Sequence, residues 1–139
     1  MPGFRVHLFG GICSFLLLTA LLKFNGLVLL NLPLNLVICL IASIFPDVDT
    51  KSKMQLWFYR LLAVLALILA LLKCWSFLII LVPILIFPLI INHRGITHKF
   101  WFIGLISLLI YLFFPCLGYL PSLYFLFGAL SHILFDKFF

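Results

Sequence analysis

The sequence predicts an all-α, polytopic membrane protein with about six transmembrane helices (five to six), and three observations lead to this fold class. Hydrophobic residues make up 67% of the 139 residues, and the mean hydropathy is +1.40. Charged residues make up only 9%, whereas about a quarter of the residues in a soluble domain are charged. Apolar runs close to the length of a membrane span recur along the chain without the alternation of membrane-spanning strands.

Breaks at polar residues, glycine or proline separate the expected spans. The second span should end at Pro46, because the residue before a proline disfavours helical geometry. Ser52 and Gln55 have capping-box spacing and would start the third span, whereas Pro83 and Pro88 would kink the fourth. The expected spans are 8–22, 27–45, 56–72, 74–91, 100–114 and 122 to the C-terminus. We expect residues 1–139 to form a single integral membrane domain.

Several types of function are disfavoured by the distribution of basic residues and cysteines. Most basic residues lie at the ends of expected spans, as membrane anchoring requires, and no basic stripe with interleaved aromatic residues is present, so we expect no nucleic-acid partner. The four cysteines lack C-x-x-C spacing and are interpreted as small apolar packing residues: Cys13, Cys39, Cys74 and Cys116.

The few acidic residues and histidines lie in four short segments of the sequence. All three aspartates and all four histidines fall within "VHLFGG", "FPDVD", "HRGITH" and "SHILFD". With six spans, an even number of crossings separates each cluster from the others, so all four should lie at one membrane face. Ionisable residues in membrane segments usually serve a function.

The spacing within the clusters favours a shared site. His132 and Asp136 are four residues apart and project from one helix face. An extended segment after Pro46 would point Asp47 and Asp49 the same way. Imidazoles and carboxylates suit a divalent metal, with zinc as the first choice and manganese or iron as alternatives. The candidate metal ligands are His7, Asp47, Asp49, His93, His98, His132 and Asp136.

Each cluster alone has an ordinary structural interpretation. His7 and "SHILFD" fit residues at a membrane interface, and "FPDVD" fits a solvated loop. Arg94 and Lys99 fit positive-inside anchors, or residues that bind an anionic substrate group. Because the chain has acids and histidines nowhere else, four separate structural interpretations are less convincing than one shared site.

The clusters, taken together, resemble the YdjM-like family of membrane-bound metal-dependent hydrolases. The resemblance covers nearly the whole chain in the right order, and "HRGITH" is its most specific part. Where the family usually has serine after this motif, the chain has Lys99. The matching residues are His7 with Gly10 and Gly11, then Pro46 to Asp49, then His93 to His98, and finally His132 to Asp136.

The expected function is that of a metal-dependent hydrolase acting on an ester or phosphoester, such as a lipid-derived one, at the membrane surface. Asp47 and Asp49 would either ligate the metal or act as general base, and Arg94 would stabilise an oxyanion or bind phosphate. Two alternatives remain open. One is a non-catalytic metal-binding or transport protein, and the other is a metal-independent lipid phosphatase with a histidine nucleophile.

The basic residues also predict the orientation of the chain in a cell (inner or plasma) membrane. Two basic residues, Lys23 and Lys73, flank the face without the clusters. The positive-inside rule then places the site and both termini in the cytoplasm, with membrane lipids as partners. The basic residues on the site face are Arg5, Lys51, Lys53, Arg60, Arg94, Lys99 and Lys137.

Overall fold

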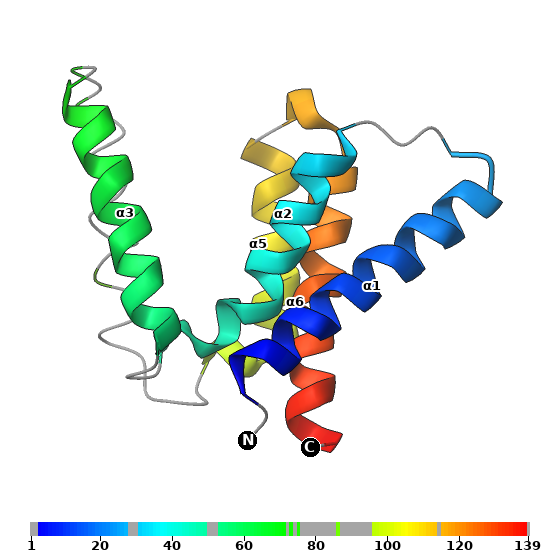
Figure 1. The fold of residues 1–139 in the computed structure, drawn as a ribbon. Coiled ribbons are helices and arrows are strands. Elements are labelled where there is room, and N and C mark those ends of the chain that lie inside the picture. The colour runs from blue at the N-terminus through cyan, green and yellow to red at the C-terminus, as the bar shows by residue number, and fades with distance from the viewer. Residues whose placement is uncertain are drawn as a thin grey trace. The chain divides into compact units, whose positions relative to one another are not determined.

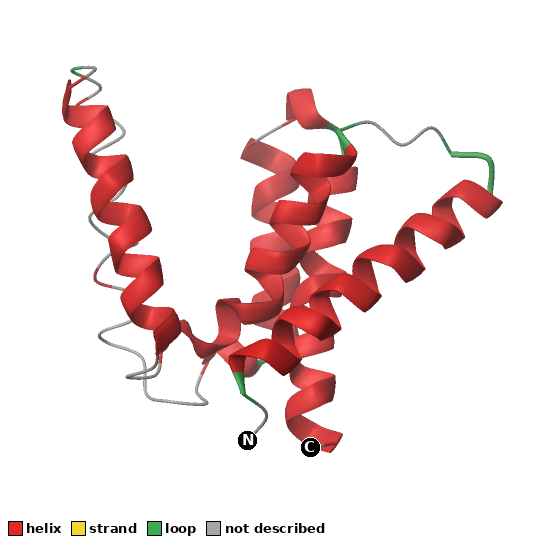
Figure 2. Ribbon diagram, in the orientation of Figure 1, coloured by secondary structure: helices red, strands yellow, loops and turns green. Residues whose placement is uncertain are grey.

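A computed structural model describes residues 3–27, 31–49, 53–71, 73, 75, 86, 96–113 and 115–138. Every regular element in these ranges is helical (Figure 2), which confirms the all-α class. The chain divides into two compact units, Met1–Pro46 with Thr97–Phe139 and, separately, Asp47–Ile96. The expected single membrane domain stays a prediction.

The first unit is built around its last helix. Helix α6 (Leu120–Phe138) packs against α1 (Phe4–Phe24), α2 (Leu32–Ile44) and α5 (Phe100–Phe113), and α1 also packs against α2 (Figure 1). In the second unit the structure describes helix α3 (Lys53–Leu71). The short 3-10 helices are η1 (Phe45–Asp49), η2 (Ile96–His98) and η3 (Pro115–Leu117).

Small residues let α2 and α6 approach closely. A Cβ added at Gly128 would collide with the carbonyl oxygen of Cys39 and would lie 3.0 Å from the Cβ of Ala42. Such close backbone approach is typical of helices that associate in a membrane, where packing replaces the hydrophobic effect as the driving force. Larger side chains fill the space on either side, with Tyr124 and Ile103 fully buried.

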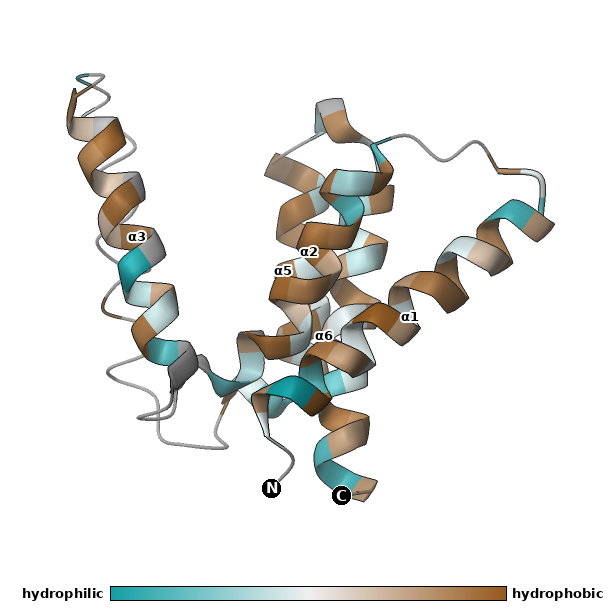
Figure 3. Cartoon of the chain, viewed as in Figure 1, coloured by the Kyte–Doolittle hydropathy of each residue, from teal (hydrophilic) through white to brown (hydrophobic). Residues whose placement is uncertain are grey.

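The predicted number of spans stays open. By length and composition, one helix in the described ranges, α1, is suited to cross a membrane. Shorter apolar helices cover Leu32–Asp47, Gln55–Ile68 and Phe100–Phe113, and apolar colour dominates these helices in Figure 3. Most of the expected fourth span, 74–91, lies outside the described residues.

Several helix starts differ from the predicted ones, and α3 is already helical at Lys53, three residues before the predicted start at 56. α1 begins at Phe4, so His7 lies inside the helix instead of before it. α2 begins at Leu32 and not at 27, because Asn31 is left-handed (φ 54°) and a proline occupies the first turn. α6 begins at Leu120, two residues early, since Pro121 is tolerated in the first turn of a helix.

Asp47 and Asp49 do not lie in the extended segment that the sequence predicted after Pro46. After α2 ends at Ile44, the chain tightens into η1, which carries both Asp47 and Asp49. A 3-10 helix has about three residues per turn, so residues two apart do not share a side as they would in a strand. The expected extended backbone after Pro46 is therefore wrong, and buried Pro46 fixes the backbone just before Asp47.

Candidate metal centre

The histidines meet at one end of the first unit. His7 lies in the second turn of α1, His98 ends η2 just before α5, and His132 lies near the end of α6. The rings of His7 and His132 stack with centroids 3.8 Å apart and an angle of 19° between their planes. His98 meets His132 edge to face, with centroids 5.4 Å apart. The predicted convergence is confirmed for these residues, and both termini leave from this end (Figure 1).

The carboxylate of Asp136 lies at the centre of the three imidazoles. Its Oδ2 is 3.5 Å from Nε2 of His98 and 3.7 Å from Nε2 of His132, and its Oδ1 is 3.5 Å from Nε2 of His7. These separations exceed the roughly 2.7–3.2 Å of an N–H···O hydrogen bond. The three nitrogens therefore face the carboxylate at distances longer than a hydrogen bond.

Four donors form the cluster suited to a metal. One donor atom from each of Asp47, His98, His132 and Asp136 lies within 4.8 Å of the others; we call this set the donor cluster. Ligands around a tetrahedral zinc, with bonds of about 2.0–2.1 Å, are separated by about 3.3–3.5 Å. The separations of 3.5 and 3.7 Å from Asp136 to His98 and His132 are close to that spacing. His98, His132 and Asp136 therefore have the donor types, and in these two separations the spacing, that suit a tetrahedral cation.

A backbone carbonyl orients the most deeply buried histidine. Nδ1 of His132 lies 2.8 Å from the carbonyl oxygen of Ser43, which accepts only from a protonated nitrogen. That bond places a proton on Nδ1, so Nε2 is the ring nitrogen directed at Asp136. Histidines that bind metals usually use their second nitrogen in this way. Nδ1 of His98 lies 3.2 Å from the hydroxyl oxygen of Thr97, which can either donate or accept this hydrogen bond.

Burial differs across the site. The side chains of His132 and His7 are 0% and 1% exposed, whereas those of His98 and Asp136 are each 13% exposed. A buried carboxylate is costly unless it is paired or binds a metal. His98 and Asp136 are therefore the partly exposed members of the site, and His7 and His132 are its buried members.

Two glycines allow α1 to reach the site. A Cβ added at Gly11 would lie 2.6 Å from the Oγ of Ser43, and one at Gly10 would lie 2.8 Å from the ring of Phe135. Ser43 supplies the carbonyl that holds His132, and Phe135 precedes Asp136 in α6. The glycines of "VHLFGG" therefore sit where α1 crosses the two helices that carry the site.

The structure brings together part of the predicted set. Asp47, His98, His132 and Asp136 form the donor cluster, and His7 contacts Asp136 beside it. The side chain of Asp49, together with His93 and Arg94, lies outside the described residues. The roles assigned to these residues stay predictions.

Ser43 is a functional residue that sequence reasoning missed. It lies in the apolar run before "FPDVD", and it acts through its backbone carbonyl, so its side chain gives no direct sign of the role. The signal available was a small polar residue one turn before the aspartates. Its hydroxyl donates to the carbonyl of Leu40 at 2.8 Å, within its own helix.

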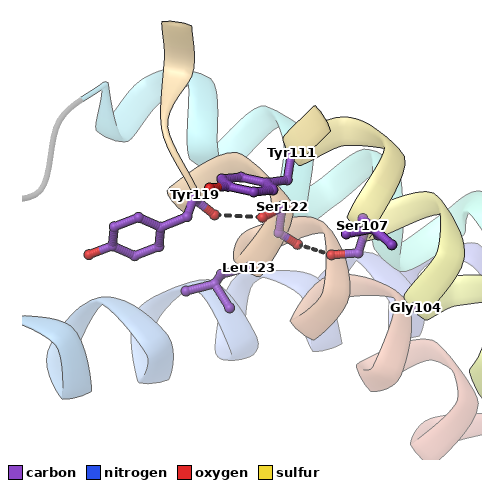
Figure 4. Close-up of a pocket in the computed structure, with 7 residues that line it drawn as sticks. Gly104, Ser107, Tyr111, Tyr119, Ser122 and Leu123 are labelled. Atoms are coloured by element: carbon purple, nitrogen blue, oxygen red, sulfur yellow. Dashed lines mark hydrogen bonds between the residues drawn. The ribbon is translucent and has the colours of Figure 1, made fainter. Parts of the chain in front are cut away.

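A cavity elsewhere in the first unit is less suited to chemistry. It has a volume of about 320 Å³ and lies between α5 and the start of α6 (Figure 4). The hydroxyl of Ser107 donates to the carbonyl of Ser122 at 2.7 Å, and the hydroxyl of Ser122 donates to the carbonyl of Tyr119 at 2.7 Å. Because these two serine hydroxyls already donate to backbone carbonyls, the donor cluster is the better candidate for a functional site.

Comparison with known proteins gives one family. A family model described as YdjM inner membrane protein matches residues 1–139, the whole chain. Searches of curated proteins and of solved structures give no match.

Proposed function

This chain belongs to the YdjM inner membrane protein family, and we propose that it is a metal-dependent hydrolase that acts at the membrane surface. The observation that carries the proposal is the convergence of two imidazoles and two carboxylates within 4.8 Å at the end of a helical bundle. Zinc is the first candidate, because the spacing of the donors suits tetrahedral coordination.

The geometry of the donor cluster suggests which of its residues would bind the metal. His98, His132 and Asp136 would supply three ligands, because both imidazoles present Nε2 to the same oxygen, Oδ2. Catalytic zinc sites commonly use three protein ligands and leave the fourth position open, whereas structural sites are closed by four. A bound cation would supply an activated water and a Lewis acid for the substrate's carbonyl or phosphoryl oxygen.

Asp47 is the proposed general base. It follows buried Pro46 in η1, and its carboxylate is one of the two in the donor cluster. A carboxylate there would accept the proton of the attacking water. Asp49 is the second candidate for this role, or for a further ligand.

Arg94 is the proposed anion-binding residue. It lies within "HRGITH", four positions before His98 in the sequence. A guanidinium offers a planar, bidentate fork that pairs with phosphate or with a developing oxyanion. The proposed substrate is therefore an ester or phosphoester, with lipid-derived molecules favoured because the site lies at the end of apolar helices.

A closed site would imply a different function. If Asp47 were a fourth ligand, the cation would be held without an open position, as in a structural or transport protein. Transporters usually carry their ligands near the middle of the membrane. Here the ligands lie at helix ends, which supports surface chemistry.

The test measures turnover and metal content together. Wild-type protein in detergent micelles, loaded with zinc, is assayed on a phosphomonoester lipid, a phosphodiester lipid and a carboxyl-ester lipid, beside Asp47→Asn. We expect hydrolysis of at least one lipid by the wild type, and an Asp47→Asn variant that keeps zinc and loses most turnover. Loss of zinc from that variant would make Asp47 a ligand, and absence of turnover on all three classes would contradict the hydrolase proposal.

A further inference from the structure

His7 stands apart from the two histidines of the donor cluster in its ring geometry. When two imidazoles bind one tetrahedral ion through Nε2, each centroid lies about 3.2 Å from the ion, and the centroids are about 5.2 Å apart. A right-angle arrangement would still separate them by about 4.5 Å. His98 and His132, at 5.4 Å, match the tetrahedral value, whereas His7 and His132, at 3.8 Å and nearly parallel, do not.

The carboxylate of Asp136 makes the same distinction. Its Oδ2 faces His98 and His132, while its Oδ1 faces Nε2 of His7 at 3.5 Å. One oxygen is thus directed at the proposed ligands and the other at His7. An N–H on Nε2 of His7 would direct partial positive charge at Oδ1 and hold the carboxylate in the orientation that presents Oδ2.

We propose that His7 is a positioning residue, which lies outside the coordination sphere of the ion and fixes both Asp136 and His132. This inference rests on the proposed metal site, and it replaces the ligand role that the sequence predicted for His7. The ring of His7 covers one face of His132, which the bond to Ser43 also holds. With 1% of its side chain exposed, His7 has no room to swing toward another position.

The course of α1 supports this role. Gly10 and Gly11 follow His7 by one turn and allow α1 to lie against Phe135 and Ser43, the neighbours of Asp136 and His132 in the site. α1 therefore packs against α2 and α6 at the end of the unit where the site lies. The donors themselves come from η1, η2 and α6.

The experiment uses cobalt as a spectroscopic replacement for zinc in the full chain, with three variants. His7→Gln keeps a side-chain N–H near the position of Nε2, His7→Phe keeps the stacked ring but loses the contact with Asp136, and His132→Ala removes a ligand. The readouts are the intensity of the visible absorption band of four-coordinate cobalt and the affinity for zinc. Circular dichroism confirms that each variant is folded.

We expect both His7 variants to keep the four-coordinate cobalt band. His7→Phe should bind zinc about 10- to 100-fold more weakly, as loss of a polar group that orients a metal ligand usually does, and His7→Gln should restore most of that affinity. His132→Ala should lose the band. If His7→Gln and His7→Phe both lose the band as His132→Ala does, His7 is a ligand and this inference is overturned. A folded wild type that binds no cobalt would overturn the metal site itself, whatever the His7 variants do.

Discussion

A single hydrogen bond determines which nitrogen of His132 faces the site. The carbonyl of Ser43 accepts from Nδ1 at 2.8 Å, so Nε2 is the nitrogen that faces Asp136 and takes no part in the bond to Ser43. The sequence predicted His132 and Asp136 as partners from their spacing of four residues on a helix. It did not predict the tautomer, because a backbone carbonyl carries no signal in the identity of a side chain.

Replacing His132 should affect stability as well as metal binding. In His132→Ala, the buried carbonyl of Ser43 loses its donor, and a fully buried side chain leaves a cavity. An unsatisfied buried polar group costs about 1–3 kcal/mol, so the metal-free variant should unfold at lower temperature than metal-free wild type in detergent.

Ser131→Ala is the matched control for this prediction. Ser131 precedes His132 in α6, and its hydroxyl donates to the carbonyl of Gly128 at 2.7 Å, within the same helix. We expect its unfolding temperature and zinc affinity to stay near the wild-type values. Equal destabilisation of the two variants would mean that the bond to Ser43 contributes nothing specific.

Arg94→Lys separates anchoring from substrate binding. A positive-inside anchor needs only charge, which lysine retains, whereas a clamp for phosphate or an oxyanion needs the planar fork of arginine. We expect Arg94→Lys to keep its zinc content and membrane topology and to lose turnover. A variant with wild-type turnover would leave Arg94 as an anchor.

Among the helices, the crossing of α1 over α2 is the close contact that lies nearest to the carbonyl holding His132. A Cβ at Gly11 would lie 2.6 Å from the Oγ and 2.9 Å from the Cβ of Ser43, so α1 and α2 must separate or Ser43 must shift. We expect Gly11→Ala to destabilise the protein by about 1–3 kcal/mol, as overpacking does, and to weaken zinc binding by moving the carbonyl that orients His132.

Gly104→Ala is the control for this substitution. Gly104 also lies within a helix, α5, but an added Cβ would meet nothing within 4 Å. Alanine is the better helix former by about 1 kcal/mol, so this variant should be as stable as the wild type or more stable. If thermal unfolding and zinc titration gave the same loss for Gly11→Ala and Gly104→Ala, the close contact at Ser43 would not be the cause.

The helices also show where prediction from the sequence ended. The start of α6 was misplaced because Pro121 was assigned to a turn, whereas the first turn of a helix accommodates proline. The start of α2 was placed too early because the left-handed backbone at Asn31 was not predicted. His7 was placed before the first helix because apolar periodicity begins after it. The order of the clusters along the chain still predicted that their donors would meet, since helix ends that share a face are brought together by packing.

For the whole molecule, we predict that both termini and the donor cluster face the cytoplasm. The start of α1 and the end of α6 lie at the same end of the first unit, since His7 contacts Asp136. Five basic residues flank this face even without Arg94 and Lys99: Arg5, Lys51, Lys53, Arg60 and Lys137. Fluorescent protein fused to the C-terminus should therefore fluoresce in the cytoplasm, whereas alkaline phosphatase fused there should stay inactive. The opposite pair of results would reverse the orientation.

The metal content of the purified chain is the most direct test of the donor cluster. Wild type, His98→Ala and Ile96→Ala are loaded with zinc in detergent, separated from free metal and measured by elemental analysis. Ile96 is the control, because it lies in η2 with His98 but is 41% exposed and offers no donor atom. We predict about one zinc ion per chain in the wild type and in Ile96→Ala, and a large loss in His98→Ala. Equal zinc in all three proteins, or none in the folded wild type, would contradict a metal centre at this site.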